Sequence, residues 1–324
     1  MNDASSTPND RTTPRANQLP GTTALCLSIA GLCLHYRGAG HLRLAAPEKC
    51  YSTFLRASPA DGPCIDTVDM EVVEGEVPRP DLLSTVVNAG DSWSMLSDER
   101  RHVFRMKVHR EADTPDWSIT VDRGFNHGRI YCSDKLIEPS GKSRIAHDII
   151  RNPLDQILVI HMGLARSASM ILNAAGGSID GQGVLFAGAA GTGKSTVSKL
   201  LGKTPNARFL SDDRIVLRRF GSKLSMYGTP WPGDAGVALN ESVPLKAICF
   251  LRHGNRTALT RLDAEEAHSR LLPVTSVPWH EPTLADRAKG LCDFLVDKYP
   301  AFDLSFRPES DELESLIDDF SRAA

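Results

Sequence analysis

The run Val184-Leu185-Phe186-Ala187 leads directly into the glycine-rich loop Gly188-Ala189-Ala190-Gly191-Thr192-Gly193-Lys194-Ser195. Glycines in such a loop let backbone N–H groups turn inward and form a nest for phosphate oxygens, assisted by the N-terminus of the helix that follows. The pattern predicts that Lys194 reaches the β- and γ-phosphates of a nucleotide and that the Ser195 hydroxyl holds Mg²⁺. Because a strand is expected before the loop and a helix after it, we expect 188–195 and the adjoining Thr196 to bind a nucleotide. A glycine-rich turn without a ligand is the alternative.

A pair of carboxylates, Asp212-Asp213, follows the short predicted strand 208–210. The loop, one helix and this strand would bring both carboxylates to the nucleotide. One of them can position Mg²⁺ through water, and the other can accept the proton of an attacking hydroxyl. Neighbouring residues of a strand point to opposite sides, which suits two different tasks. The alternative is an acidic turn at the end of a strand.

Residues 171–216, with this loop and this acidic pair, resemble the catalytic domain of HPr kinase/phosphorylase, a family that shares its core with ATP-dependent phosphoenolpyruvate (PEP) carboxykinase. The resemblance implies an α/β fold: a P-loop kinase domain of the HPr kinase/PEP carboxykinase type, here with a β-rich N-terminal domain. It implies ATP and Mg²⁺ as cofactors, with Lys194 and Ser195 in contact with phosphate and magnesium. It also makes Asp213 the catalytic proton acceptor and places Asp212 beside it, in contact with magnesium or water.

Two positions depart from the family. Asn173 stands where the family has a catalytic histidine, and Thr196 stands where its loop has a glutamate. Neither side chain can exchange a proton near neutral pH, so we expect no reverse reaction with inorganic phosphate. Forward transfer from ATP needs only positioning, magnesium and a base. The chain therefore resembles the stand-alone HPr-kinase-like proteins, some of which are similar to kinases that tailor ribosomally made peptides, such as lasso-peptide precursors.

Three further features have open interpretations. Residues 228–234 form a Gly/Pro-rich loop that ends in Asp234; the resemblance makes Asp234 a candidate magnesium ligand, and a rigid surface loop with Trp231 packed on the sheet is equally favoured. Arg252 and Arg256 follow the predicted strand 246–251 and could stabilise the phosphoryl group in transit. A solvated strand end is the more ordinary interpretation of these arginines. His280 is interpreted as structural.

The length of 324 residues predicts two domains. We expect a disordered leader at 1–20, a β-rich domain at 21–151 that presents the acceptor, and a catalytic α/β domain at 152–324. The expected strands of the β-rich domain include 25–35, 102–109 and 117–121. In the catalytic domain we expect strands 169–174 and 183–187 around a turn at 176–181, a hairpin of 214–219 and 223–227, a strand at 246–251, and helices at 263–272, 283–299 and 310–321. Asn152 and Thr283 are the predicted caps of helices.

Composition limits the classes of function. The formal net charge of -3 argues against general nucleic-acid binding. The apolar runs are far shorter than the roughly 20 residues that span a bilayer, so no membrane is expected. Seven cysteines without a CxxC pair indicate reduced thiols in a cytoplasmic protein rather than a disulfide framework or a zinc site.

The sequence thus predicts an ATP-dependent kinase that transfers the γ-phosphate to a hydroxyl, most simply serine of a peptide or protein. The alternatives are a small-molecule kinase, acting on free serine or a sugar, and a nucleotide-dependent switch ATPase. The acceptor, the choice between ATP and GTP, and assembly into a homo-oligomer stay open.

Overall fold

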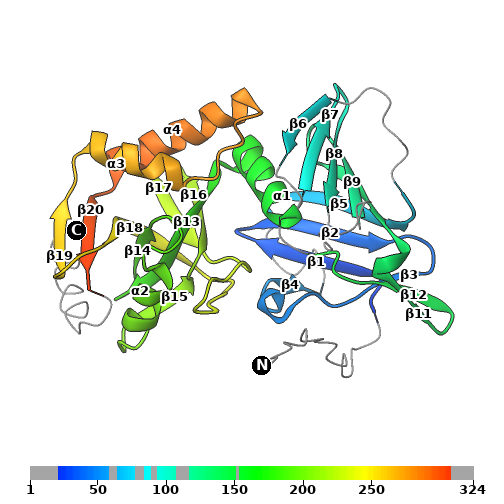
Figure 1. The fold of residues 1–324 in the computed structure, drawn as a ribbon, viewed down its shortest axis with the longest axis horizontal. Coiled ribbons are helices and arrows are strands. Elements are labelled where there is room, and N and C mark those ends of the chain that lie inside the picture. The colour runs from blue at the N-terminus through cyan, green and yellow to red at the C-terminus, as the bar shows by residue number, and fades with distance from the viewer. Residues whose placement is uncertain are drawn as a thin grey trace, which may run out of the picture.

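The computed structural model describes residues 21–57, 64–76, 84–88, 93–106, 117–150 and 153–307. The predicted leader, the predicted helix 310–321 and the predicted cap Asn152 lie outside these residues. The described chain is a mixed α/β fold with large sheets and few helices. Figure 1 shows an N-terminal lobe (residues 21–150) and a C-terminal lobe (residues 163–307), with helix α1 (Leu154–Met162) between them. The domain boundary at 151/152 stays a prediction.

The N-terminal lobe contains two sheets. The larger has nine strands in the order β4-β1-β2-β5-β10-β9-β8-β7-β6, and the smaller has the order β11-β12-β3. The strands described in this lobe are β1 (Ala24–Ile29), β2 (Leu32–Gly38), β3 (Leu42–Leu44), β4 (Leu55–Arg56), β5 (Asp66–Glu74), β6 (Ser84–Asn88), β7 (Trp93–Ser97), β8 (Arg101–Met106), β9 (Trp117–Asp122), β10 (His127–Cys132), β11 (Ile137–Ser140) and β12 (Ser143–Ala146).

The predicted strand 25–35 is wrong, because it is a hairpin. β1 and β2 pair antiparallel around a turn at Ala30 and Gly31, whose φ angles are 52° and 78°. Two successive positive φ angles are what a tight two-residue hairpin turn needs. The apolar residues on both sides of Gly31 concealed this turn, whereas the predicted strand 117–121 is confirmed as β9.

The C-terminal lobe has eight strands and three helices among the described residues. They are β13 (Ser169–Ile179), β14 (Gln182–Ala187), α2 (Lys194–Leu201), β15 (Ala207–Ser211), β16 (Arg214–Phe220), β17 (Lys223–Tyr227), β18 (Ser242–His253), β19 (Ala258–Arg261), α3 (Ala264–Leu271), α4 (Pro282–Lys298) and β20 (Ala301–Phe306). β13, β14, β18, β17 and β16 pair in succession, and β16 pairs back with β13, so these strands close into a ring.

Two apolar cores lie on opposite faces of β14 and β18. Phe186 and Cys249 pack in one core with residues of α2. Leu185 and Ile248, their chain neighbours, pack in the other core with residues of α3 and α4. Successive side chains of a strand point to opposite faces, so each strand serves both cores. This packing fixes the end of β14, where the glycine-rich loop begins.

Two local predictions in this lobe need correction. The predicted turn 176–181 is mostly strand, since β13 runs to Ile179 and the chain turns at Asp180 and Gly181. A Cβ on Gly176 would lie 2.6 Å from Ile215, so this glycine allows close packing inside the sheet. The cap of α4 is Glu281, without a side-chain cap bond, and not Thr283; Pro282 begins the helix.

The lobes share a core. The apolar cluster of the N-terminal lobe takes in α1 and also Ile171, Val216 and Trp231 from the C-terminal lobe. Asp155 of α1 is completely buried at this junction and accepts hydrogen bonds from the Tyr51 hydroxyl at 2.6 Å and the Trp231 indole at 2.7 Å. The two lobes are therefore packed on each other.

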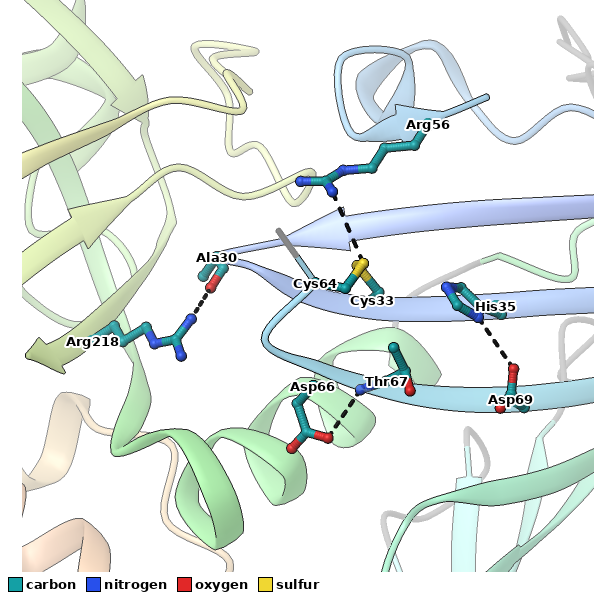
Figure 2. Close-up of a disulfide and its surroundings, with 9 residues drawn as sticks. All are labelled: Ala30, Cys33, His35, Arg56, Cys64, Asp66, Thr67, Asp69 and Arg218. Atoms are coloured by element: carbon teal, nitrogen blue, oxygen red, sulfur yellow. Dashed lines mark hydrogen bonds and ion pairs between the residues drawn. A yellow bond between two sulfur atoms is a disulfide. The ribbon is translucent and has the colours of Figure 1, made fainter. Parts of the chain in front are cut away.

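A disulfide joins Cys33 and Cys64, contrary to the expected set of reduced thiols (Figure 2). The two cysteines are separated by 31 positions, and the parallel pairing of β2 with β5 brings them together. No spacing in the sequence marked this pair. Among the helices that the structure describes, none is both long and apolar enough to cross a membrane.

Candidate phosphate-binding site

The glycine-rich loop connects the end of β14 to the first turn of α2, as the sequence predicts. Gly191 and Gly193 have φ angles of 80° and 98°, which glycine adopts without strain. A Cβ on Gly193 would lie 2.4 Å from the Phe306 ring. Both the backbone path and the packing therefore need glycine at position 193, directly before the helix.

Lys194 is folded into the loop that precedes it. Its side chain is 6% exposed, and Nζ donates to the carbonyl oxygens of Gly188 and Ala189, each at 3.0 Å. Nζ also lies 3.7 Å from Oδ1 of Asp213. Burial lowers the pKa of Lys194, and the Asp213 carboxylate opposes this effect in part. A cation is thus held between the loop and one of the two predicted carboxylates.

Asp212 is completely buried and has all its acceptor capacity in use. Oδ2 accepts from the Ser195 hydroxyl at 3.0 Å and from the Ala235 N–H at 2.7 Å. Oδ1 accepts from the N–H groups of Gly233 at 2.9 Å and Val237 at 3.1 Å. Asp212 therefore ties α2 to the loop that follows β17.

Asp213 points to the opposite side and is one-third exposed. Its Oδ2 accepts from Nη1 of Arg214 at 2.8 Å, and the same nitrogen donates to the side-chain oxygen of Asn173 at 2.8 Å. Asp213 thus lies between the cations of Lys194 and Arg214. The sequence had drawn no attention to Arg214, although its place directly after the acidic pair was a signal that could have been used.

The Gly/Pro-rich loop 228–234 approaches the acidic pair through its backbone. A Cβ on Gly233 would lie 2.9 Å from Asp212 Oδ2 and 3.3 Å from Ser195 Oγ. Asp234 follows and is exposed. Trp231 is buried at the lobe junction and not on a surface loop, because its indole bonds to Asp155.

The residues around Gly233 fit a hard cation. The hydroxyl of Ser195 and a carboxylate oxygen of Asp212 lie against the backbone of Gly233, 3.3 Å and 2.9 Å from the place that a Cβ would take. Oxygen ligands of this kind suit Mg²⁺, which keeps several of its waters in protein sites. Asp212 is held by four donors and orients the Ser195 hydroxyl, while Ser195 and the exposed Asp234 fit contact with the ion.

The remaining candidates fall elsewhere. Arg252 bonds Asp303 at 2.7 Å, and its side chain is 60% exposed, as expected of a solvated strand end. His253, at the end of β18, contacts the loop through Nε2, 2.8 Å from the Gly191 carbonyl oxygen. His280 is not isolated, because its Nε2 lies 3.4 Å from Nε2 of His161.

No family model matches the chain. No curated protein matches it either. Among solved structures, the chain is similar to the HPr(Ser) kinase/phosphatase from Coxiella burnetii, with 15% sequence identity and a TM-score of 0.27. The match covers 47% of this chain and 94% of that chain. A likeness this distant assigns no role to any residue, so the roles have to come from the site itself.

Proposed function

We propose that the protein is an ATP-dependent kinase that transfers the γ-phosphate to a hydroxyl, serine of a peptide or protein. One observation carries the proposal. Lys194 Nζ lies 3.7 Å from Asp213 Oδ1, while Ser195 Oγ bonds Asp212 Oδ2 at 3.0 Å, so a cation, a hydroxyl and two carboxylates meet at one glycine-rich loop. Phosphoryl transfer needs these groups for charge, metal and base.

Each residue has a role in the proposed reaction. The loop 188–195 and Thr196 bind the phosphates of ATP, and Lys194 with Arg214 offsets the negative charge that spreads over the phosphoryl oxygens. The acceptor oxygen bonds to the γ-phosphorus as the bond to the bridging oxygen breaks, and Asp213 accepts the hydroxyl proton. Ser195, Asp212 and Asp234 would hold Mg²⁺, which neutralises charge on the phosphates when bound.

The reaction is proposed to run in one direction. The side-chain oxygen of Asn173 is bonded to Arg214 at 2.8 Å, and an amide does not titrate near neutral pH. Thr196 does not titrate either. Neither of these two positions therefore has a group that could activate inorganic phosphate by proton transfer. Phosphorylated product incubated with excess phosphate should yield no pyrophosphate.

The acidic pair gives the sharpest experiment. Asp213→Asn should lower the rate of phosphate transfer at least tenfold while ATP binding is retained, because the base acts on the acceptor. Asp212→Asn should instead raise the magnesium requirement. Transfer from labelled ATP to serine-containing peptides and to free serine, with magnesium titrations, separates these effects.

Asp180→Asn is the matched control, since Asp180 lies in the β13–β14 turn at a φ of 48° that asparagine tolerates well. Full activity in Asp213→Asn would contradict the assigned base. Turnover on free serine alone would favour a small-molecule kinase. ATP hydrolysis that no acceptor stimulates would favour a switch ATPase.

A further inference from the structure

Three side chains of the kind that bind metals lie together on the nine-stranded sheet, in the lobe away from the glycine-rich loop. β1 and β2 place Cys26 opposite His35 and Ser28 opposite Cys33. Opposite residues of an antiparallel pair share a face, as do residues two apart, so Cys26, Cys33 and His35 point to the same side. One ligand atom from each of the three lies within 4.8 Å of the others.

The imidazole of His35 is oriented by a carboxylate. Nδ1 lies 3.1 Å from Oδ1 of Asp69, its register partner on β5 (Figure 2). A carboxylate only accepts, so Nδ1 carries the proton and the lone pair is on Nε2. Nε2 is buried and has no hydrogen-bond partner among the described residues. A histidine held by a carboxylate with its other nitrogen unsatisfied is typical of a metal ligand.

The disulfide holds a fourth ligand at the same place. Cys64 is bonded to Cys33, and its sulfur lies 3.9 Å from Nη1 of Arg56 (Figure 2). Arg56 is the register partner of Cys26 on β4. A dithiol reductant would deliver two electrons and two protons, break the S–S bond and itself become a disulfide. Reduction would thus leave the thiols of Cys33 and Cys64 beside Cys26 and His35.

We propose that the reduced protein binds a zinc ion through the sulfurs of Cys26, Cys33 and Cys64 and Nε2 of His35. The Cys33–Cys64 disulfide is then the metal-free, oxidised form of this site. Three thiolates and one imidazole form a tetrahedral set that suits zinc, and bond lengths of about 2.3 Å to sulfur and about 2.0 Å to nitrogen require ligand atoms somewhat closer than they lie now.

Charge and access agree with the proposal. Zinc with three thiolates and a neutral imidazole carries a net negative charge, which Arg56 beside Cys64 would offset. Binding releases the thiol protons to solvent. Cys26, His35 and Asp69 also line a cavity of about 910 Å³, which gives the ion a way in. The sequence concealed the site because the ligands are brought together by a hairpin and a parallel strand, with no short CxxC spacing.

The test measures zinc bound to the full chain in two redox states. Protein reduced with a dithiol, then desalted without oxygen, should retain a single zinc ion, and the oxidised protein should retain none. Cobalt added to the reduced protein should give the visible absorption of a tetrahedral thiolate complex. Cys26→Ser and His35→Gln should each weaken zinc binding at least tenfold, and Asp69→Asn should weaken it by about 10- to 100-fold.

Cys50→Ser is the matched control, because Cys50 is a thiol of the same lobe that is not in the disulfide, and it should bind zinc as the wild type does. Cys26→Ser leaves the disulfide intact, so thermal unfolding of its oxidised form checks its fold. Zinc binding that is equal in both redox states, or unchanged by both Cys26→Ser and His35→Gln, would overturn the proposal. If the variants do not fold, a wild-type cobalt spectrum without thiolate bands would overturn it.

Discussion

The glycine-rich loop and the lobe junction each bury a carboxylate completely, but they satisfy it in different ways. Asp212 accepts from one hydroxyl and from three backbone N–H groups that lie 21 to 25 positions away. Oδ2 of Asp155 accepts from the side chains of Tyr51 and Trp231, which are 104 and 76 positions away, and Oδ1 accepts from the neighbouring Gln156 N–H at 3.0 Å. Backbone donors are present whatever the side chain is, whereas the long-range hydrogen bonds of Asp155 depend on two particular side chains.

The difference has an electrostatic consequence at the junction. Burial raises the pKa of Asp155, and the hydrogen bonds from Tyr51 and Trp231 oppose this effect only in part. Burial also raises the pKa of the Tyr51 hydroxyl, with the Asp155 charge adding to the effect. A buried carboxylate without a cation in contact costs stability when it is ionised. Ionisation of Asp155 therefore costs stability at the junction.

The largest expected effect is at the loop. Lys194→Ala should abolish phosphate transfer and leave the fold intact, since the side chain bonds only the loop and Asp213. Loss of such a charge raises the barrier by on the order of 3 kcal/mol or more. Labelled phosphate transfer and circular dichroism measure the two outcomes. Phosphate transfer at the wild-type rate in this variant would contradict the proposal that the loop binds a nucleotide.

The next largest effect is expected on the pH dependence of stability, at a histidine cluster near the junction. His161 donates from Nδ1 to the Ile157 carbonyl at 2.7 Å and faces His280, His102 and the Phe125 ring; Arg123 and Glu281 lie behind them. Burial lowers the pKa of His161 to about 4, and His280 adds to the shift.

Because the folded pKa of His161 is depressed, its contribution to stability is present above the unfolded value of about 6.5 and is lost as the pH falls toward 4. The loss amounts to at most roughly 3 kcal/mol. His161→Asn keeps a donor for Ile157 and should flatten the fall in melting temperature over this range. An identical pH profile in the variant would show that other groups cause it.

Asp155→Ala tests the junction directly. It leaves the Tyr51 hydroxyl and the Trp231 N–H buried without an acceptor and should lower the free energy of unfolding by about 2 kcal/mol. Asp155→Asn keeps an acceptor and cannot ionise. The raised pKa of Asp155 gives the wild type stability at low pH that is lost as the pH rises through this pKa. The free energy of unfolding of Asp155→Asn should therefore compare best with that of the wild type at neutral pH. Chemical denaturation at two pH values measures both variants.

The smallest effect is expected at Arg252. Its side chain is 60% exposed, and its partner Asp303 also bonds Arg270. Arg252→Ala should lower stability by less than about 1 kcal/mol and leave phosphate transfer unchanged. A large loss of phosphate transfer in Arg252→Ala would show that Arg252 acts in the phosphate-binding site.

The sequence by itself determined the local architecture around the loop. The strand before it, α2 after it, and the hairpin of β16 and β17 follow from the glycine pattern and from apolar periodicity. These signals act over a few residues, since they reflect backbone freedom and alternation of side chains. The nearness of Lys194 and Ser195 to the acidic pair followed as well, because one helix and one strand separate them.

Only the tertiary structure decided what meets across long separations. The partners of Asp155, the disulfide of Cys33 and Cys64, and the contact of His161 with His280 join segments from different elements. A buried polar group needs a partner, but a linear pattern does not state which distant element supplies it. Packing of the two lobes makes that choice for Asp155 and His161, and the pairing of β2 with β5 makes it for the two cysteines.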